Sequence, residues 1–256
     1  MLKIIVLGSG NAFNEGERMY PGFLVQTDRS KFLIDCGPTA VFQLRKLGID
    51  FQSLDGLIIT HFHGDHIAGI PFLFLDFHYQ SRRARQFTCV GPMGLDITIE
   101  RLYKACYEKT ATEPRTYPLK HMPIKPKETV SEFGVQIQAF PMLHSPESLG
   151  YRITHPSAAI AVTGDTSWNN EIVKMANGVD LLIIEGNFWD RDAGGHMSYQ
   201  VLEKHLSEIN ARKIVLTHPS RDVLGREKEL RIPLLHDSQE IDLDKNSIRI
   251  SKGRSN

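Results

Sequence analysis

The stretch "THFHGDHIAG" (residues 60–69) crowds three histidines and an aspartate directly behind the apolar run 57–59. The whole chain holds only 11 histidines in 256 residues, so this density needs a reason. Imidazole nitrogens and carboxylate oxygens are good ligands for Zn²⁺, Mn²⁺ and Fe²⁺. The stretch therefore predicts a metal site rather than a polar surface loop, with four candidate ligands: His61, His63, Asp65 and His66.

Four ligands in one short loop are too many for a single metal that also binds other groups, but they can divide between two adjacent metals. Three further candidates each follow a predicted strand: His144 after "QAFPML", Asp165 after "AIAVTG" and His218 after "KIVLT". Loops at strand ends, held by a rigid sheet, commonly carry functional side chains. The repeated order of apolar strand and then ligand predicts that these residues meet.

The composition narrows the class of protein. Thirty basic and thirty acidic side chains cancel, so no global positive field favours nucleic acid or an anionic membrane. No apolar run approaches the roughly 18–20 residues of a membrane helix. The three cysteines are odd in number and far apart, which argues against a disulfide framework and suits a reducing compartment. We expect a cytoplasmic protein with no membrane partner.

The strand pattern predicts the fold class. The segments 22–28 and 31–37 read as a hairpin, and later strands alternate with helical segments such as 198–210. This mixture predicts an α+β protein of two packed sheets with helices outside, and residues 1–256 show no linker that would divide them. We expect a surface excursion at 110–130, which holds four prolines, and a solvated basic cluster at 82–85.

The ordered set of candidate ligands resembles the metallo-β-lactamase superfamily, whose signature HxHxDH is matched in full by residues 61–66. The resemblance extends over most of the chain, and it implies an αββα four-layer sandwich. It also implies how the ligands divide. One metal would take His61, His63 and His144, the other would take Asp65, His66 and His218, and Asp165 would bridge the two.

A second pair of residues resembles the transfer-RNA 3′-processing nucleases (ribonuclease Z). Glu185 in "LLIIEGNF" and His196 in "GGHMSYQVL" lie between the bridging aspartate and the last ligand, as in that branch. The resemblance implies that His196 assists the leaving group and that Glu185 orients the imidazole. The alternative is that His196 only caps the helix that starts near Ser198.

The chain also departs from ribonuclease Z. That family carries a long arm between the third and fourth ligand motifs, whereas here residues 145–164 read as two plain strands. We therefore expect a small or cyclic phosphodiester as substrate, with nucleic acid as a less favoured alternative. Aspartate rather than cysteine at position 165 argues against a β-lactamase. A thioester or lactone hydrolase and a metal-binding scaffold are further alternatives.

These features predict a dinuclear metal-dependent hydrolase of the phosphodiesterase type. Two cations would share one hydroxide, because coordination brings the pKa of water from 15.7 to about 7. Asp65 would hold or accept its proton, and Asp35 is the candidate partner of a metal-bound histidine. Zn²⁺ is the expected metal, with Mn²⁺ or Fe²⁺ as alternatives. The apolar stretch 71–77 is either core or a dimer face, and the resemblance favours a homodimer.

Overall fold

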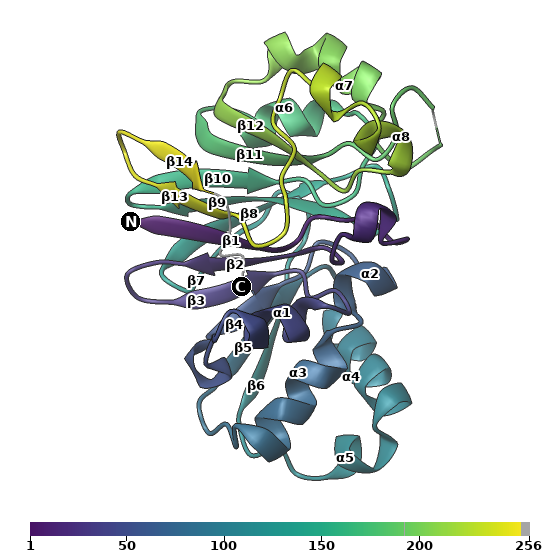
Figure 1. The fold of residues 1–256 in the computed structure, drawn as a ribbon. Helices are drawn as coiled ribbons and strands as arrows, with labels where there is room; N and C mark the ends of the chain where they lie inside the picture. Colours follow the sequence, from purple (N-terminus) through teal and green to yellow (C-terminus); the bar gives the residue numbers. More distant parts are fainter. Residues whose placement is uncertain (192, 252–256) are drawn as a thin grey trace.

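The computed structural model describes residues 1–191 and 193–251. Two β-sheets face each other, and helices cover the outer side of each sheet (Figure 1). This is the four-layer αββα sandwich that the sequence predicts. Along the chain, each half supplies one sheet with its own helices, except that the last two strands return to the first sheet.

The first sheet has eight strands in the order β14-β13-β1-β2-β3-β4-β5-β6. Its pairing is antiparallel from β14 to β3 and parallel from β3 to β6. The predicted hairpin is confirmed as β2 and β3. The strands are β1 Leu2–Gly8, β2 Gly22–Gln26, β3 Lys31–Ile34, β4 Gly56–Ile58, β5 Phe87–Gly91, β6 Leu119–Pro123, β13 Glu240–Leu243 and β14 Ile248–Ser251.

The second sheet has six strands in the order β12-β11-β10-β9-β8-β7. Neighbours from β7 to β10 are antiparallel, and β10, β11 and β12 run parallel. The strands are β7 Thr129–Glu132, β8 Val135–Pro141, β9 Leu149–His155, β10 Ala158–Val162, β11 Val179–Glu185 and β12 Ala211–Thr217.

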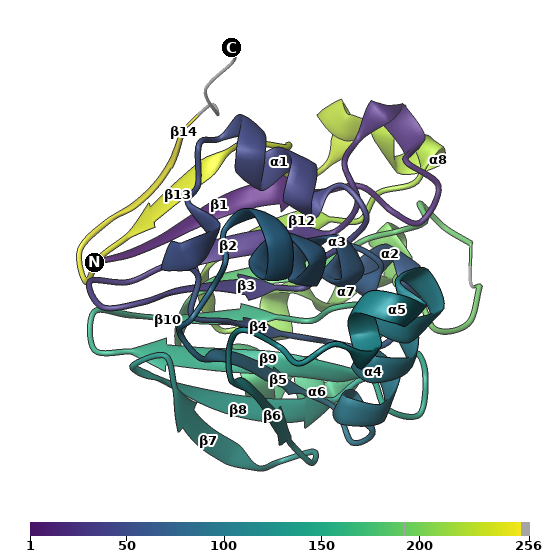
Figure 2. The same cartoon turned by 90° about the horizontal axis from the view of Figure 1, so that it is seen from below.

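The helices form the two outer layers. Figure 2 shows α1, α3, α4 and α5 in front of the first sheet. In chain order the helices are α1 Ala40–Lys46, α2 Gly64–Ile67, α3 Ile70–Leu75, α4 Leu95–Cys106, α5 Glu108–Thr112, α6 Asn170–Ala176, α7 Tyr199–His205 and α8 Arg221–Leu224. A π-helical turn, Asp76–Gln80, continues α3, and 3₁₀ turns lie at Glu15–Glu17, Phe51–Ser53, Leu206–Glu208 and Glu227–Glu229.

Three apolar layers hold these four layers together. In β1, Ile4 and Val6 belong to the cluster between the two sheets, whereas Ile5 and Leu7 pack under the helices of the first sheet. A strand buried on both faces needs apolar residues at every position, which explains the unbroken apolar run "IIVL" at residues 4–7. A third cluster joins the second sheet to α6 and α7.

The apolar stretch 71–77 is mostly core. Pro71, Leu73, Phe74 and Phe77 are buried, and Phe72 is 49% exposed. Most of this stretch therefore packs against the first sheet instead of forming an external face.

The prediction that residues 110–130 form a surface excursion is wrong, because this segment contributes strands to both sheets. Its middle forms β6, which pairs parallel with β5, and its end enters β7, which pairs antiparallel with β8. Both β6 and β7 are edge strands, where one side of the backbone needs no partner and proline is tolerated. Proline content alone therefore misled the prediction.

The expected solvated cluster at 82–85 is also wrong for Arg83. This side chain is fully buried, and it donates hydrogen bonds to five backbone carbonyl oxygens, those of Phe51, Gln52, Leu54, Arg85 and Gln86. Its guanidinium also lies 4.8 Å from the ring centre of Phe77. Burial lowers the pKa of Arg83 to about 10. Arg83 thus ties together loops of the first sheet.

Strands β4, β10, β11 and β12 all end at the same side of the sandwich. The start of β9 lies at the end of β4, β10 runs antiparallel to β9, and β11 and β12 run parallel to β10. Tyr151 on β9 donates a 2.8 Å hydrogen bond to the carbonyl of Ile59, and Leu149 N donates to the carbonyl of Thr60 at 2.9 Å. These bonds join the two sheets directly beneath the histidine-rich loop. Within the described residues, no helix has the length and apolar character needed to span a membrane.

Candidate metal centre

The structure brings all seven predicted ligands together from five segments: the loop after β4, helix α2, and the loops after β8, β10 and β12. The first two, His61 and His63, lie in the loop after β4, and Asp65 and His66 lie in α2. The others follow β8, β10 and β12. Their potential ligand atoms form two groups, each within 4.8 Å: one holds His61, His63 and His144, and the other holds Asp65, His66, Asp165 and His218.

The first group consists of three imidazoles. His144 Nε2 lies 2.8 Å from His63 Nδ1, and His61 Nε2 lies 3.8 Å from Asp165 Oδ2. His144 Nδ1 lies 2.8 Å from the carbonyl oxygen of Gly195, which can only accept. The proton of His144 is therefore on Nδ1, and Nε2 presents a lone pair to the centre.

The second group combines two imidazoles with two carboxylates. Asp65 Oδ2 lies 3.4 Å from Nε2 of both His66 and His218. Asp165 Oδ1 lies 3.3 Å from His66 Nε2, and its Oδ2 lies 3.4 Å from His218 Nε2. Since Asp165 Oδ2 also faces His61 Nε2, this carboxylate stands between the two groups.

Asp35, the predicted partner of a ligand histidine, contacts His66 as expected. It accepts three hydrogen bonds of 2.8 Å, from His66 Nδ1, Thr60 N and Thr60 Oγ1. Its backbone has φ of 57°, in the left-handed region that aspartate tolerates better than most residues. Asp35 therefore orients both the His66 ring and the start of the histidine-rich loop.

Thr60, which the sequence analysis did not single out, sets the tautomer of His61. Its hydroxyl proton goes to Asp35, so its oxygen accepts from His61 Nδ1 at 3.1 Å. The signal was available in the sequence, because Thr60 directly precedes the ligand run. His61, like His144, then turns an unprotonated Nε2 toward the centre.

The donor set fits divalent cations. The buried Nε2 atoms of His61 and His66 have no hydrogen-bond partner among the described residues. Lone pairs of nitrogen facing carboxylate oxygens at 3–4 Å repel each other unless a positive charge lies between them. Burial lowers the pKa of His66, but the carboxylates of Asp165 and Asp35 outweigh burial and raise it overall. Cations would therefore stabilise this centre, and groups of imidazole nitrogen and carboxylate oxygen ligands bind transition metals.

Glu185 and His196 meet beside this centre. Glu185 ends β11, is fully buried and accepts a hydrogen bond from Thr166 N. His196 Nδ1 lies 3.3 Å from both of its carboxylate oxygens and 3.9 Å from Asp165 Oδ2. The imidazole of His196 therefore contacts a carboxylate rather than the start of α7. Burial lowers the pKa of His196, but the hydrogen bond and the charge of Glu185 outweigh burial, so the net pKa is raised.

A pocket of about 440 Å³ adjoins His196 and the loop after His218. Its lining includes the half-exposed or exposed aromatic rings of Phe188 and Phe13, and the buried side chains of Asn11 and Asn187. The ring of Phe188 lies edge-on to His196, with ring centres 6.1 Å apart. This pocket is the space next to the centre that could hold an organic group of a substrate.

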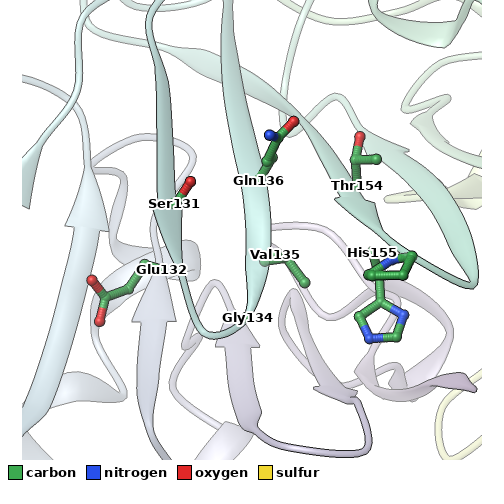
Figure 3. A pocket seen from close by; sticks show the side chains of 8 residues that line it. Ser131, Glu132, Gly134, Val135, Gln136, Thr154 and His155 are labelled. Atoms are coloured by element: carbon green, nitrogen blue, oxygen red, sulfur yellow. The ribbon is translucent and has the colours of Figure 1, made fainter.

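Two larger pockets, of about 550 and 590 Å³, lie elsewhere. Figure 3 shows the first, formed where the β7–β8 turn and the end of β9 meet, with Val135 and His155 in its wall. These residues lie at the opposite ends of β8 and β9 from the loops that carry the ligands. No predicted site residue lines any of these three pockets, and the smaller one is linked to the centre through the contact of Phe188 with His196.

An αββα sandwich with an HxHxDH loop and a histidine–aspartate centre at one edge defines a metallo-β-lactamase fold hydrolase. A sequence profile of the family described as Anti-Pycsar protein Apyc1 matches residues 2–236, and the chain belongs to this family.

Similar proteins support the assignment to the metallo-β-lactamase fold hydrolases. The probable metallo-hydrolase YhfI of Bacillus subtilis (strain 168) is 27% identical over 220 residues, which cover 85% of this chain and 86% of the relative. Its crystal structure has a TM-score of 0.77 at 22% identity, covering 94% of this chain and 100% of that chain. The crystal structure of human tRNase Z, short form (ELAC1), also has a TM-score of 0.77, at 23% identity, covering 94% of this chain and 99% of that one.

Ribonuclease Z of Bradyrhizobium sp. (strain ORS 278) is 25% identical over 291 residues, covering 90% of this chain and 95% of the relative. This alignment is longer than the 256-residue chain itself, so the relative contains segments that this chain lacks. In this structure the segment between His144 and Asp165 holds only β9, β10 and short turns, as the sequence predicts. With these relatives, the histidine–aspartate centre implies a hydrolase that uses divalent metal ions.

Proposed function

We propose that this protein is a dinuclear metal-dependent phosphodiesterase that acts on a small or cyclic phosphodiester. The observation that carries the proposal is the position of Asp165, between two groups of potential ligand atoms and 3.9 Å from the acid-base candidate His196. The proposed ligands are those assigned by resemblance, with three imidazoles for one ion and Asp65, His66 and His218 for the other. Asp165 would serve both ions.

Two cations bound at these two groups would lower the pKa of water and offset the negative charge of a phosphoryl group in the transition state. Zn²⁺ is our proposed metal, because the donor set mixes imidazole nitrogen with carboxylate oxygen. The three cysteines, Cys36, Cys89 and Cys106, are free thiols, which supports a reducing compartment such as the cytoplasm. We treat residues 1–256 as one functional unit.

Asp65 is proposed to orient the attacking water. Burial raises the pKa of its carboxyl group, but the neighbouring imidazoles of His218 and His66 lower it more strongly, so the net pKa is lowered. A carboxylate with a lowered pKa accepts a hydrogen bond from water more readily than it carries a proton away. This supports a holding role, with the proton leaving by another route.

His196 is proposed to protonate the leaving alkoxide. Its raised pKa favours the charged imidazole, and Nδ1 is occupied by Glu185, which leaves Nε2–H to donate. The adjoining pocket, with Phe188 against His196, is then the place for the alcohol part of the substrate. Glu185 is a positioning residue for the imidazole and stabilises its charged form.

A transfer-RNA 3′ endonuclease is the second candidate, supported by the ribonuclease Z relative. The short connection between His144 and Asp165 and the balanced charge of the chain weigh against it. A thioester or lactone hydrolase on the same fold is a further alternative, for which the Glu185–His196 pair has no evident use.

The test is hydrolysis of bis(p-nitrophenyl) phosphate and of cyclic nucleotides by the zinc-loaded protein, beside cleavage of a precursor transfer RNA. We expect metal-dependent turnover of the small diesters, lost in Asp165→Ala. Cleavage of the RNA at a higher kcat/KM than any small diester would favour the second candidate. A protein that holds two zinc ions and cleaves none of these substrates would overturn the proposal.

A further inference from the structure

His218 has a backbone conformation that residues with a Cβ atom rarely adopt. Its φ is 63°, in the left-handed region where a residue with a Cβ is strained, although histidine tolerates it better than most. Such a conformation persists when neighbouring contacts over-determine it. The backbone contact that holds His218 is a 3.0 Å hydrogen bond from its N–H to the carbonyl oxygen of Ser9, at the end of β1.

Ser9 is itself fixed by Asp237, far along the chain. Asp237 Oδ1 accepts hydrogen bonds from Ser9 N at 2.9 Å and from Ser9 Oγ at 2.7 Å. Its other oxygen, Oδ2, accepts from Met19 N at 2.7 Å. One carboxylate thus clamps both ends of the loop that connects β1 to β2, and Ser9 is fully buried.

The buried guanidinium of Arg18 braces the same serine. Arg18 Nη1 donates to Ser9 Oγ at 2.8 Å and to the carbonyl of Leu235 at 2.5 Å, and Nη2 lies 3.0 Å from His236 Nδ1. Arg18 is 8% exposed, so its charge is held in place by these contacts. Polar contacts made away from water have well-defined geometry, because a displaced partner is left unsatisfied.

The segment that carries Asp237 is anchored to both sheets. Leu235 N donates to the carbonyl of Leu216 in β12, and Ser238 N donates to the carbonyl of Val6 in β1. A shift of Asp237 relative to β12 is therefore resisted on both sides. The family match ends at residue 236, one position before this carboxylate.

We infer that Asp237 is a positioning residue for His218, acting through Ser9, and that it sets the affinity of the second metal position. The inference rests on the proposed role of His218 as a ligand. Partners behind metal ligands typically change metal affinity about 10–100-fold when they are replaced. In the first group, His61 is held by Thr60 and His144 by the carbonyl oxygen of Gly195, and neither contact involves Asp237. We therefore expect the first metal position not to depend on Asp237.

The test measures stepwise Zn²⁺ binding, by competition with a chromogenic chelator and by metal content after gel filtration, in the full chain. In Asp237→Asn one acceptor oxygen becomes a donor that opposes Ser9 or Met19. We expect one of the two zinc ions to bind about 10–100-fold less tightly and the other to be unchanged. Ser9→Ala removes the hydroxyl but keeps the backbone contacts, so we expect a smaller loss of the same ion.

Asp244→Asn is a matched control. Like Asp237, Asp244 accepts two backbone N–H bonds and one serine hydroxyl, here from Asn246 N, Ser247 N and Ser247 Oγ. It lies in the β13–β14 turn, and within the described residues its carboxylate forms no hydrogen bond with a predicted ligand or with a residue that contacts one. We expect wild-type affinity for both zinc ions in this variant.

Unchanged zinc binding in both Asp237→Asn and Ser9→Ala would overturn the inference, and so would equal weakening of both ions, which indicates a general effect on the fold. If Asp237→Asn does not fold, Ser9→Ala decides between these outcomes. A wild-type protein that fails to bind two zinc ions would instead refute the proposed dinuclear site, so the two failures are distinguishable.

Discussion

The Nδ1 atom of His196 lies 3.3 Å from both carboxylate oxygens of Glu185, and this carboxylate is fully buried. A buried carboxylate that faces an imidazole stabilises the charged imidazolium and leaves its second nitrogen free to donate a proton. The first two predictions follow from this pair.

His196→Ala should slow the hydrolysis of diesters with poor leaving groups far more than that of activated ones. General acid catalysis contributes typically about 10²–10⁴-fold, and p-nitrophenolate leaves without protonation. We therefore expect a loss of about that size with an alkyl diester and a small loss with bis(p-nitrophenyl) phosphate. His121→Ala, on β6, serves as the control. An equal loss with both substrates would contradict a role in protonating the leaving group.

Glu185→Gln should move the basic limb of the pH profile of kcat/KM to lower pH. Glu185 raises the pKa of His196 against burial, and the protonated imidazole is the active form. Removing the charge lowers this pKa, so the imidazole loses its proton, and the enzyme its rate, at a lower pH than in the wild type. Rate measurements across the basic range check the shift. A basic limb in the wild-type position would show that Glu185 does not tune His196.

Metal removal should destabilise the protein. The Nε2 atoms of His61 and His66 are buried without a partner among the described residues, and cations that bind only the folded state stabilise it. At a metal concentration of 100 times Kd this is worth about 2.7 kcal/mol per ion. Thermal unfolding with and without a chelator measures the effect, and added Zn²⁺ should restore the wild-type Tm. In Asp165→Ala the chelator should change the Tm much less.

Asp35→Ala should cost several kcal/mol of folding stability. The substitution leaves Thr60 N, Thr60 Oγ1 and His66 Nδ1 without their acceptor, at about 1–3 kcal/mol for each buried unsatisfied group. Alanine is also strained at the φ of 57° found there. Asp35→Asn keeps one acceptor oxygen and tolerates that φ, so its cost should be smaller. Urea unfolding of both variants provides the comparison, and equal stabilities would count against this account.

Phe13→Ala should raise KM for substrates with a bulky alcohol part and leave kcat nearly unchanged. Phe13 lines the pocket beside His196 and is 80% exposed, so its removal should not disturb the core. Contacts made equally in the ground state and the transition state affect KM alone. Phe42→Ala is the matched control, because Phe42 is 60% exposed on α1 and is not part of this pocket. A KM equal to the wild-type value would exclude the pocket from substrate binding.

The ligand run was readable from the sequence because its chemistry is local. His61, His63, Asp65 and His66 are neighbours in the chain, and Glu185 stands at the end of an apolar strand that is easy to recognise. The order of strands and helices also predicted two sheets with outer helices, since burial on one or both faces leaves its period in the residue pattern. These features depend on short-range spacing.

The sequence-based predictions were wrong where contacts between distant parts of the chain determine the structure. Proline at 118 and 123 did not keep residues 119–123 out of the first sheet, because an edge strand needs partners on one side only. The charge of Arg83 did not place it in solvent, because backbone carbonyls from a separate loop satisfy it. Both outcomes depend on which distant segment of the chain packs against these residues in the folded protein. Residue composition does not determine that packing.

The sequence by itself determined the chemistry of the candidate ligands, their positions at strand ends and the class of fold, because each depends on residue type and spacing along the chain. Only the tertiary structure decided how the ligands are aimed. The contact of Asp35 with His66 and the path from Asp237 through Ser9 to His218 join residues 31 to 228 positions apart. Their geometry follows from sheet pairing and from buried hydrogen bonds that must all be satisfied together.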